Sequence, residues 1–574
     1  MKKLYLSLLL SIAALATKSQ ITVFEKSNQR ETATYFETIE FYKKLDQISS
    51  KVAIKTMGPT DAGYPLHVIM VSGNSKFDPN QWHKQGKVVI MVNNGIHPGE
   101  PDGVDASMLL VRNFVNGKLL LPQNVVLAII PIYNIGGSLN RNSSTRVNQN
   151  GPESYGFRGN AQNLDLNRDF TKCDSKNAAS FAKIFHWLNP DILIDNHVSD
   201  GADFQHTMTM ITTQYEKLGK TAGTWLRNVF EPQIYQGMKN KNWDLIPYVE
   251  FDGADFDKGI TMFNETPRYS SGYAALFNCF SFIPETHMLK SYAERVRSTY
   301  DLMVTFLEKA SINAKEIVLT RKLAFEEQQR MDSFALKFVP EKTRRSEISF
   351  SGYSQDSAVS QATGLMKMFY NRNAPYSRKI KFYNYFSEEN IVQAPKAYVM
   401  GAGWHEVMNR LKLNNIQYRV LKHDTTIFVA TYKITNYKSR ANAYEKHHAN
   451  YNVSVKKQID SILFLKGDYY IPINQPGKRY LIEMLEPTGD DSFFAWNFFD
   501  AILQQKEGYS EYRWEDAAAD VLKKDTALQI KLAEKRKADP AFDKNSSAIL
   551  NFIYVNSRWL EKTFMRYPVF RVEK

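Results

Sequence analysis

Cysteine is nearly absent from this chain of 574 residues, which contains only Cys173 and Cys279. Two cysteines cannot build a disulfide-rich scaffold or a zinc site made of thiolates. An oxidising compartment would permit one bridge between them, and the sequence alone does not decide whether it forms. A metal site in this protein would therefore use histidine and carboxylate ligands.

Long apolar runs are missing after the first residues, so we expect no membrane span, which takes roughly 18 or more apolar residues. The opening stretch, "MKKLYLSLLLSIAALATKSQ", has two lysines, an apolar run and then small and polar residues. This is the layout of a secretory signal peptide. We predict a signal peptide at residues 1–19 and a secreted or periplasmic protein; a buried N-terminal helix is the alternative.

A basic stripe interleaved with aromatic residues is also missing. The formal net charge is +13, and most of the excess lies in residues 331–574, where the basic residues are scattered. We therefore expect no nucleic-acid partner. The excess is compatible with an anionic envelope or acidic polymer, although a solvated basic surface is the simpler interpretation.

Apolar runs that look like buried strands alternate with helical patterns between residues 60 and 300. This alternation predicts an α/β fold with a mixed, mostly parallel central sheet flanked by helices. The strands are expected at 66–72, 87–94, 125–134, 191–198 and 281–286, and the helices at 102–117, 177–189 and 292–310.

The pattern changes near residue 331, where short strand-like pieces separated by turns become common. We therefore predict a catalytic domain at 20–330 and a β-rich accessory domain of unknown role, with C-terminal helices, at 331–574. Within the second part, 478–485 is expected to be a strand, and 492–505 and 526–538 are expected to be helical.

Ionisable residues follow three of the predicted strands directly. His97 and Glu100 come after 87–94, His197 ends 191–198, and Glu285 ends 281–286. Ligands of open α/β sheets bind at the carboxyl ends of strands. Two histidines and a glutamate form a typical catalytic zinc set with one open position. The pattern predicts one zinc ion per chain, held by His97, Glu100 and His197.

The sequence leaves alternatives open for some of the site residues. His206 and His287 compete for the third ligand position, but His197 terminates its strand directly and is favoured. Glu265, in the turn-like "FNETP", is a rival to Glu285, but it does not end an apolar strand. An acidic group could line a pocket for a basic substrate side chain, although a solvated loop is the simpler interpretation; it comprises Glu250, Asp252, Asp255 and Asp257.

Four motifs in the order "HPGE", "FRGNAQNLDLNRDF", "DNHVSDG" and "FIPETH" resemble the zinc metallocarboxypeptidases over approximately residues 35–310. Residues beyond 331 look similar to the extra region of a secreted bacterial branch of that family. The resemblance implies zinc ligands at His97, Glu100 and His197. It also implies that Arg158 polarises the scissile carbonyl, that Asn167 and Arg168 bind the terminal carboxylate of the substrate, and that Glu285 is the general base.

The function that this resemblance implies is an exported zinc carboxypeptidase that removes C-terminal residues from peptides. A peptidoglycan stem-peptide amidohydrolase or an N-acyl-amino-acid deacylase with the same site is the alternative. A non-catalytic binding module is the least favoured, because all seven of the site residues are present. The sequence leaves open the oligomeric state and the tyrosine that covers the substrate, for which Tyr248, Tyr269 and Tyr273 are candidates.

Overall fold

The computed structural model describes residues 20–199, 201–249 and 256–573. The predicted signal peptide and three members of the acidic group, Glu250, Asp252 and Asp255, lie outside these residues. Both cysteines are buried, and their thiols are free. Within the described ranges, the structure has no helix that is both long and apolar enough to cross a membrane.

The chain divides into two compact units. The first contains the described residues up to Ala394, together with Met408–Gln417 and Asn474–Met484. The second contains Pro395–Val407, Tyr418–Ile473 and the residues from Leu485 onward. A division into compact units does not show whether either part folds or acts alone. The domain boundary between residues 330 and 331 therefore stays a prediction.

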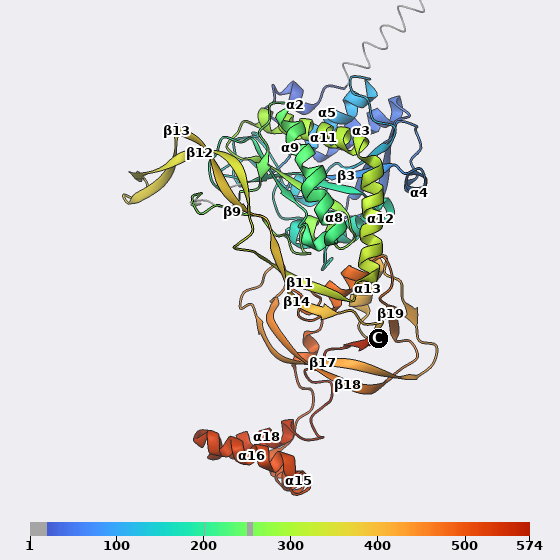
Figure 1. The fold of residues 1–574 in the computed structure, drawn as a ribbon, viewed down its shortest axis with the longest axis vertical. Helices are drawn as coiled ribbons and strands as arrows, with labels where there is room; N and C mark the ends of the chain where they lie inside the picture. Colours follow the sequence, from blue (N-terminus) through green and yellow to red (C-terminus); the bar gives the residue numbers. More distant parts are fainter. Residues whose placement is uncertain (1–19, 200, 250–255, 574) are drawn as a thin grey trace, which may run out of the picture. The chain divides into compact units, whose positions relative to one another are not determined.

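A nine-stranded mixed sheet forms the centre of the first unit, in the order β1-β2-β4-β3-β5-β10-β7-β8, with β6 beside β10 (Figure 1). The four middle strands, β4, β3, β5 and β10, run parallel. The predicted α/β class is confirmed. The strands are β1 Val52–Pro59, β2 Pro65–Val71, β3 Val88–Asn93, β4 Val125–Ile130, β5 Ile192–Asp195, β6 His197–Ser199, β7 Met208–Thr212, β8 Ile246–Pro247 and β10 Phe280–His287.

Every residue of β3, β4 and β5 is buried, as expected for strands covered on both faces. Helix α11 packs on α5 and on β3, β4 and β10, while α7 contacts β1 and α10 contacts β5 and β10. The main helices of the unit are α3 Tyr35–Ile48, α5 Asp102–Val115, α7 Lys176–Leu188, α9 Glu231–Lys239, α10 Ser270–Ala275, α11 Tyr292–Ile312 and α12 Ala314–Arg330; shorter ones are α2 Val23–Lys26, α4 Pro79–Lys84, α6 Ile135–Leu139 and α8 Gly219–Trp225.

Two antiparallel ribbons extend the first unit beyond the sheet. One pairs β11 (Ser333–Pro340) with β14 (Phe386–Gln393). The other pairs β12 (Ser346–Val359) with the long β13 (Met366–Tyr383), whose end runs beside β9 (Ile260–Thr261). The ribbon of β12 and β13 is fastened to the segment after β6, because Gln205 N donates to Ser351 O at 2.9 Å.

The second unit contains a six-stranded sheet in the order β16-β19-β15-β20-β17-β18 and a separate group of helices with its own apolar core around Trp514 and Leu528. Its strands are β15 Ala397–Met400, β16 Arg419–Val420, β17 Thr425–Ser439, β18 Asn450–Phe464, β19 Tyr469–Pro472 and β20 Val569–Val572, and its helices are α15 Glu511–Lys524, α16 Thr526–Ala538, α17 Pro540–Asp543 and α18 Ser546–Val555. Helices α13 (His405–Leu413) and α14 (Lys478–Leu485) contain residues of both units.

Two expectations for the C-terminal region are wrong. Residues 478–485 form helix α14 rather than a strand, since a short, only partly apolar segment does not distinguish a buried strand from a buried helix. Residues 492–505 form turns with one short 3-10 helix, Asp500–Leu503. Asn497 takes a φ of 67°, a left-handed conformation that interrupts a helix. The helix predicted at 526–538 is α16.

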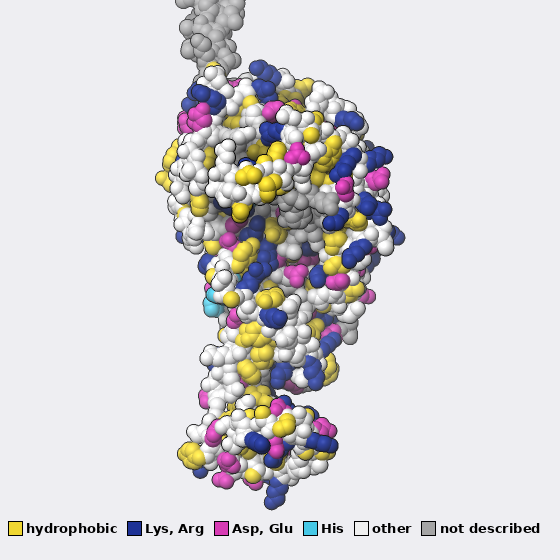
Figure 2. Space-filling model, turned by 90° about the vertical axis from the view of Figure 1, so that its left-hand side faces the viewer, with side chains coloured by type: hydrophobic (Ala, Val, Ile, Leu, Met, Phe, Trp, Pro, Cys, Tyr) yellow, Lys and Arg dark blue, Asp and Glu magenta, His cyan; other side chains and the backbone are white. Residues whose placement is uncertain are grey.

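On the face shown in Figure 2, basic and acidic side chains are interspersed rather than gathered in a patch of one sign. This distribution agrees with the simpler interpretation of the basic excess, a solvated surface.

A buried arginine joins three parts of the first unit. Arg295 of α11, with no exposed surface, donates from Nε to Asp102 Oδ2 of α5 at 2.9 Å. Its other nitrogens donate to the carbonyl oxygens of Asn150 at 2.7 Å and Gly151 at 2.8 Å. Asp102 also accepts a hydrogen bond from Thr286, the residue after Glu285.

We predict that Arg295→Met lowers the free energy of unfolding by about 3–5 kcal/mol, because it leaves the Asp102 carboxylate buried without its cation. Denaturant unfolding followed by tryptophan fluorescence measures this change. Arg297→Met, two residues along the same helix at an exposed position, is the matched control, with an expected change of at most about 0.5 kcal/mol. Equal stabilities of the two variants would contradict the prediction.

Candidate metal centre

The turn after β3 carries His97 and Glu100 at the carboxyl end of the central strands. Glu100 N donates to His97 O at 2.9 Å, which closes the turn, and α5 begins two residues later. Gly103, in the first turn of α5, has no space for a side chain: a Cβ there would lie 2.3 Å from Asn94 Oδ1. The start of α5 thus packs directly against the ends of the strands.

The sheet register brings His197 to the same place. Asn93 at the end of β3 pairs with Asp195 at the end of β5, and His197 follows two residues later. Glu100 Oε1 lies 3.3 Å from His97 Nδ1, and Glu100 Oε2 lies 3.1 Å from His197 Nδ1. The three side chains are at most 4% exposed, and one ligand atom from each lies within 4.8 Å of the others.

Carboxylates hold the far sides of both imidazole rings. Asp165 Oδ1 lies 2.9 Å from His97 Nε2, and Asp195 Oδ2 lies 3.3 Å from His197 Nε2. Histidines that bind metal ions usually place the second ring nitrogen against such a partner. His97 Nδ1 is buried without a hydrogen bond within the described part of the chain. Two oriented imidazoles and a carboxylate fit a zinc ion with one open position.

The charges in the cluster favour a cation between its members. Burial raises the pKa of Glu100, but the charges of His97 and Arg146 and a hydrogen bond from His197 hold it well below its usual value. Burial lowers the pKa of His197, but Asp195 and Glu100 keep it well above its ordinary value. The carboxylates around the imidazoles therefore stabilise positive charge at this position.

Arg158 lies at the edge of the cluster. Its Nε and Nη2 lie 3.0 Å and 2.9 Å from Asp165 Oδ2, and its Nη1 lies 3.6 Å from Glu100 Oε1. The side chain is 45% exposed. The Arg158 guanidinium thus reaches the carboxylate of Glu100 and is still accessible, so it can also contact a bound molecule.

Asn167 and Arg168 follow Asp165 in a short 3-10 helix, Leu166–Arg168, which Asp165 caps by accepting from Asn167 N at 2.9 Å. Asn167 Oδ1 accepts a hydrogen bond from Ser270 N at 3.4 Å. The Arg168 guanidinium lies over the Tyr269 ring, 4.5 Å from its centre. The first turn of α10 therefore supports both polar side chains.

Glu285 lies in β10, opposite His197 of β6 in the parallel register, and its side chain is half-buried. Its charge contributes to the raised pKa of His197, so the two side chains are near each other. Glu265 is almost completely buried, and its Oε2 accepts from Ser271 N at 3.0 Å and Ser271 Oγ at 2.5 Å. Burial raises the pKa of Glu265 to about 7.

The rival histidines are engaged elsewhere. His206 Nε2 accepts from Ser351 N at 3.0 Å, and His287 stacks on Phe204 with 4.1 Å between ring centres. Among the candidate tyrosines, Tyr273 is fully buried and donates to Asn414 at 2.6 Å, and Tyr269 lies beneath Arg168. The geometry thus brings together His97, Glu100 and His197 and keeps both rivals outside the cluster.

Sequence reasoning missed three residues that contact the cluster. Asp165 and Asp195 each lie two residues before a predicted site residue, and their proximity to the motifs was the available signal. Arg146, whose Nη1 donates to Glu100 Oε1 at 2.9 Å, lies in "STRVNQN", where no pattern distinguishes it.

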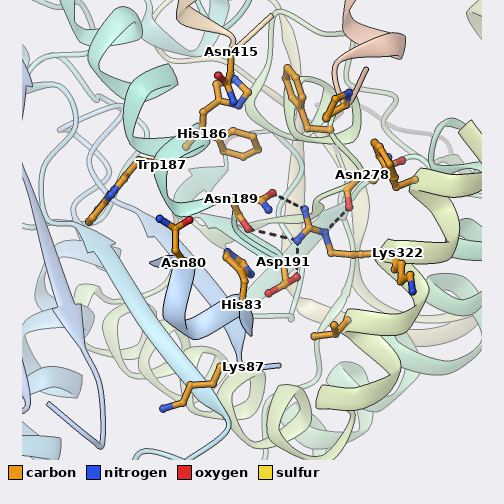
Figure 3. A pocket seen from close by; sticks show the side chains of 16 residues that line it. Asn80, His83, Lys87, His186, Trp187, Asn189, Asp191, Asn278, Lys322 and Asn415 are labelled. Atoms are coloured by element: carbon orange, nitrogen blue, oxygen red, sulfur yellow. Dashed lines mark hydrogen bonds and ion pairs between the residues drawn. The ribbon is translucent and has the colours of Figure 1, made fainter. Parts of the chain in front are cut away.

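A separate cavity of about 540 Å³ lies at the amino ends of β3, β5 and β10, the edge opposite the metal centre (Figure 3). Arg321 is one of its lining residues; it lies 2.5 Å from Asp191 Oδ1 and donates to Asn278 O at 2.9 Å and Asn189 Oδ1 at 3.2 Å. Because the Arg321 guanidinium already binds these oxygen atoms, it is not available as a free cation for a ligand.

Residues 38–210 match the family model described as zinc carboxypeptidase. A search of curated proteins gave no match. Among solved structures, a metallo-carboxypeptidase from Burkholderia cenocepacia is similar at 15% identity and a TM-score of 0.36, covering 49% of this chain and 70% of that chain.

Two further solved structures are similar at the same level. A metallo-carboxypeptidase from Pseudomonas aeruginosa, in complex with (2-guanidinoethylmercapto)succinic acid, has 13% identity and a TM-score of 0.37, with coverage of 50% of this chain and 70% of that chain. Carboxypeptidase A from Helicoverpa armigera has 15% identity and a TM-score of 0.36, with coverage of 49% and 74%.

We predict that Asp165→Asn weakens zinc binding about 10- to 100-fold, because His97 loses the carboxylate that orients its ring. Competition with a chromophoric chelator measures the affinity. His206→Ala is the control and should bind zinc as the wild type does. Loss of zinc from His206→Ala, or an unchanged affinity of Asp165→Asn, would contradict this assignment of the ligands.

Proposed function

We propose that the chain is a zinc-carboxypeptidase-type hydrolase that removes C-terminal residues from peptides, with Glu285 as the general base. The match of residues 38–210 to the zinc carboxypeptidase family model supports the proposal. The observation that carries the proposal is the joint position of the His97–Glu100–His197 cluster, Glu285 and Arg168 at one edge of the sheet. Export by residues 1–19, to the periplasm or the outside of the cell, is part of this proposal.

We propose zinc at His97, Glu100 and His197, which would polarise a carbonyl group and make water more acidic. Glu285, across the strand pair from His197, accepts the proton of the attacking water and later gives it to the leaving amine. Arg158 donates to the carbonyl oxygen as negative charge develops on it.

The proposed exopeptidase action depends on Asn167 and Arg168. A guanidinium binds a carboxylate through two parallel hydrogen bonds. Arg168 is 20% exposed and is supported from below by Tyr269, so its fork is held in place before a substrate arrives. A peptide whose free carboxylate binds there presents its last amide bond to the metal centre.

We predict that the zinc-loaded protein hydrolyses a peptide with a free C-terminus and does not hydrolyse the same peptide amidated. Glu285→Gln should lower kcat by about 10²- to 10⁴-fold, since the proton acceptor is lost, while about one zinc per chain remains. Mass spectrometry of the products and metal analysis test both statements. Zinc without trimming of either peptide would refute the proposal, and cleavage confined to muropeptides or acyl-amino acids would select the alternative substrates.

Arg168→Met should reduce kcat/KM for the free peptide by about 10- to 100-fold, the loss expected for a hydrogen bond between charged groups. Steady-state kinetics against Arg297→Met, an exposed arginine on α11, provides the comparison. If both variants retain the wild-type value, Arg168 does not bind the carboxylate.

A further inference from the structure

The six-stranded sheet of the second unit ends in a long strand whose outer edge is free. β18 is the last strand in the order of this sheet and pairs with β17 along its inner side, from Asn450 to Phe464 (Figure 1). No other strand of the described chain pairs with its outer side. Such an edge presents a row of backbone N–H and C=O groups that can pair with a further strand.

One face of the sheet is apolar and exposed beside this edge. Phe428 of β17 lies opposite Ser461 of β18, and Ile459 and Leu463 are two residues to either side of Ser461, so all four side chains share one face. Phe428, Ile459 and Leu463 are 70%, 52% and 59% exposed. The other face of the two strands packs on an apolar core that includes Val429. An apolar patch of this kind beside a free edge marks an interaction surface.

Two side chains of opposite charge, Lys456 and Asp460, lie four residues apart on β18. Both are exposed, and neither makes an ion pair within the described residues. Lys457 differs, because it already pairs with Glu573 at 2.8 Å. A lysine on an edge strand usually opposes the approach of another strand. Here an aspartate follows at a fixed spacing on the same face, so a partner strand with the reverse order of charges would neutralise both.

We propose that the partner of this edge is a second copy of β18, and that the protein forms a twofold-symmetric dimer through antiparallel β18–β18 pairing. The register centred on Gln458 places Lys456 of each copy opposite Asp460 of the other, so the symmetry makes the pair twice. A register centred on Lys457 would oppose two lysines, and one centred on Ile459 would leave both charges unpaired. The inference goes beyond the proposed function and does not depend on it.

The same register joins the apolar faces of the two copies. Leu463 lies opposite Val453 of the other copy, and the two Ile459 side chains are diagonal neighbours across the axis, within reach of each other. Phe428 lies beside Ile459 and Leu463 on each half of the dimer. One face of the continuous sheet would thus carry the apolar contacts and the other face the charge pairs, which favours a second copy over an unrelated strand.

Sedimentation velocity of the full chain over a range of concentrations should show a reversible dimer that dissociates on dilution, because a single strand pair makes a small interface. Lys456→Asp and Asp460→Lys should each raise the dimer Kd by about 10-fold, since like charges then oppose each other twice. The double substitution exchanges the charges and should return the Kd to within about 3-fold of the wild type. Lys367→Asp, at an exposed strand lysine of the first unit, is the control and should leave the Kd unchanged.

Cross-linking tests the register itself. Opposite Cα atoms of an antiparallel pair are about 4.5–5.5 Å apart, a distance that a disulfide spans. Gln458→Cys should therefore form a disulfide between two chains when oxidised glutathione is added. Ser454→Cys, on the same strand, would lie about 27 Å from its own copy and should not. The two native cysteines are buried, so they do not compete.

A chain that stays monomeric at every concentration would overturn the inference and leave the edge to a strand of a different protein. The inference would also be overturned by a dimer that keeps its Kd in Lys456→Asp, or by one that the exchange of charges does not restore. Cross-linking of Ser454→Cys without cross-linking of Gln458→Cys would have the same consequence, because the dimer would then use another register or surface.

Discussion

The site depends on one constraint: the Glu100 carboxylate is 3% exposed and has to be surrounded by positive charge. Arg146 provides that charge at 2.9 Å, and the Nδ1 atoms of His97 and His197 lie 3.3 Å and 3.1 Å from the carboxylate. This requirement agrees with the tight turn after β3 and with Gly103, in the first turn of α5, which packs against the strand ends. If the start of α5 moved away from β6, Glu100 would lose its hydrogen bond from Val198 N at 3.0 Å.

Two further carboxylates, those of Asp165 and Asp102, connect the cluster with the segments around it. Asp165 contacts His97 and Arg158 and caps the 3-10 helix that carries Asn167 and Arg168. This one side chain therefore links the orientation of a ligand imidazole to the position of the groups proposed to bind substrate. On the other side, Asp102 joins Arg295 and Thr286 and so holds the end of β10 that carries Glu285.

The elements that position the cluster could be predicted from the sequence because their patterns are local. The apolar runs at 87–94 and 191–198 correspond to β3, β5 and β6, and the helix expected at 102–117 is α5. His97, Glu100 and His197 meet because parallel strands end at one edge. Arg146 could not be predicted, since it lies 46 residues from Glu100 in the sequence, with α5, β4 and α6 between them. Likewise, helix α14 has buried charged residues, among them Arg479 and Glu483, which pair at 2.9 Å, and the sequence pattern alone does not indicate that they are buried.

Glu265 shows why a buried carboxylate in an irregular segment is harder to recognise from the sequence than one at the end of a strand. Glu285, the proposed base, lies in β10, where the fold dictates the direction of its side chain. Glu265 lies in the irregular segment before α10, and its side chain is almost completely buried and accepts two hydrogen bonds from Ser271. Burial raises the pKa of Glu265 to about 7. Desolvation of this kind depends on the complete tertiary structure, so no local pattern in the sequence reveals it.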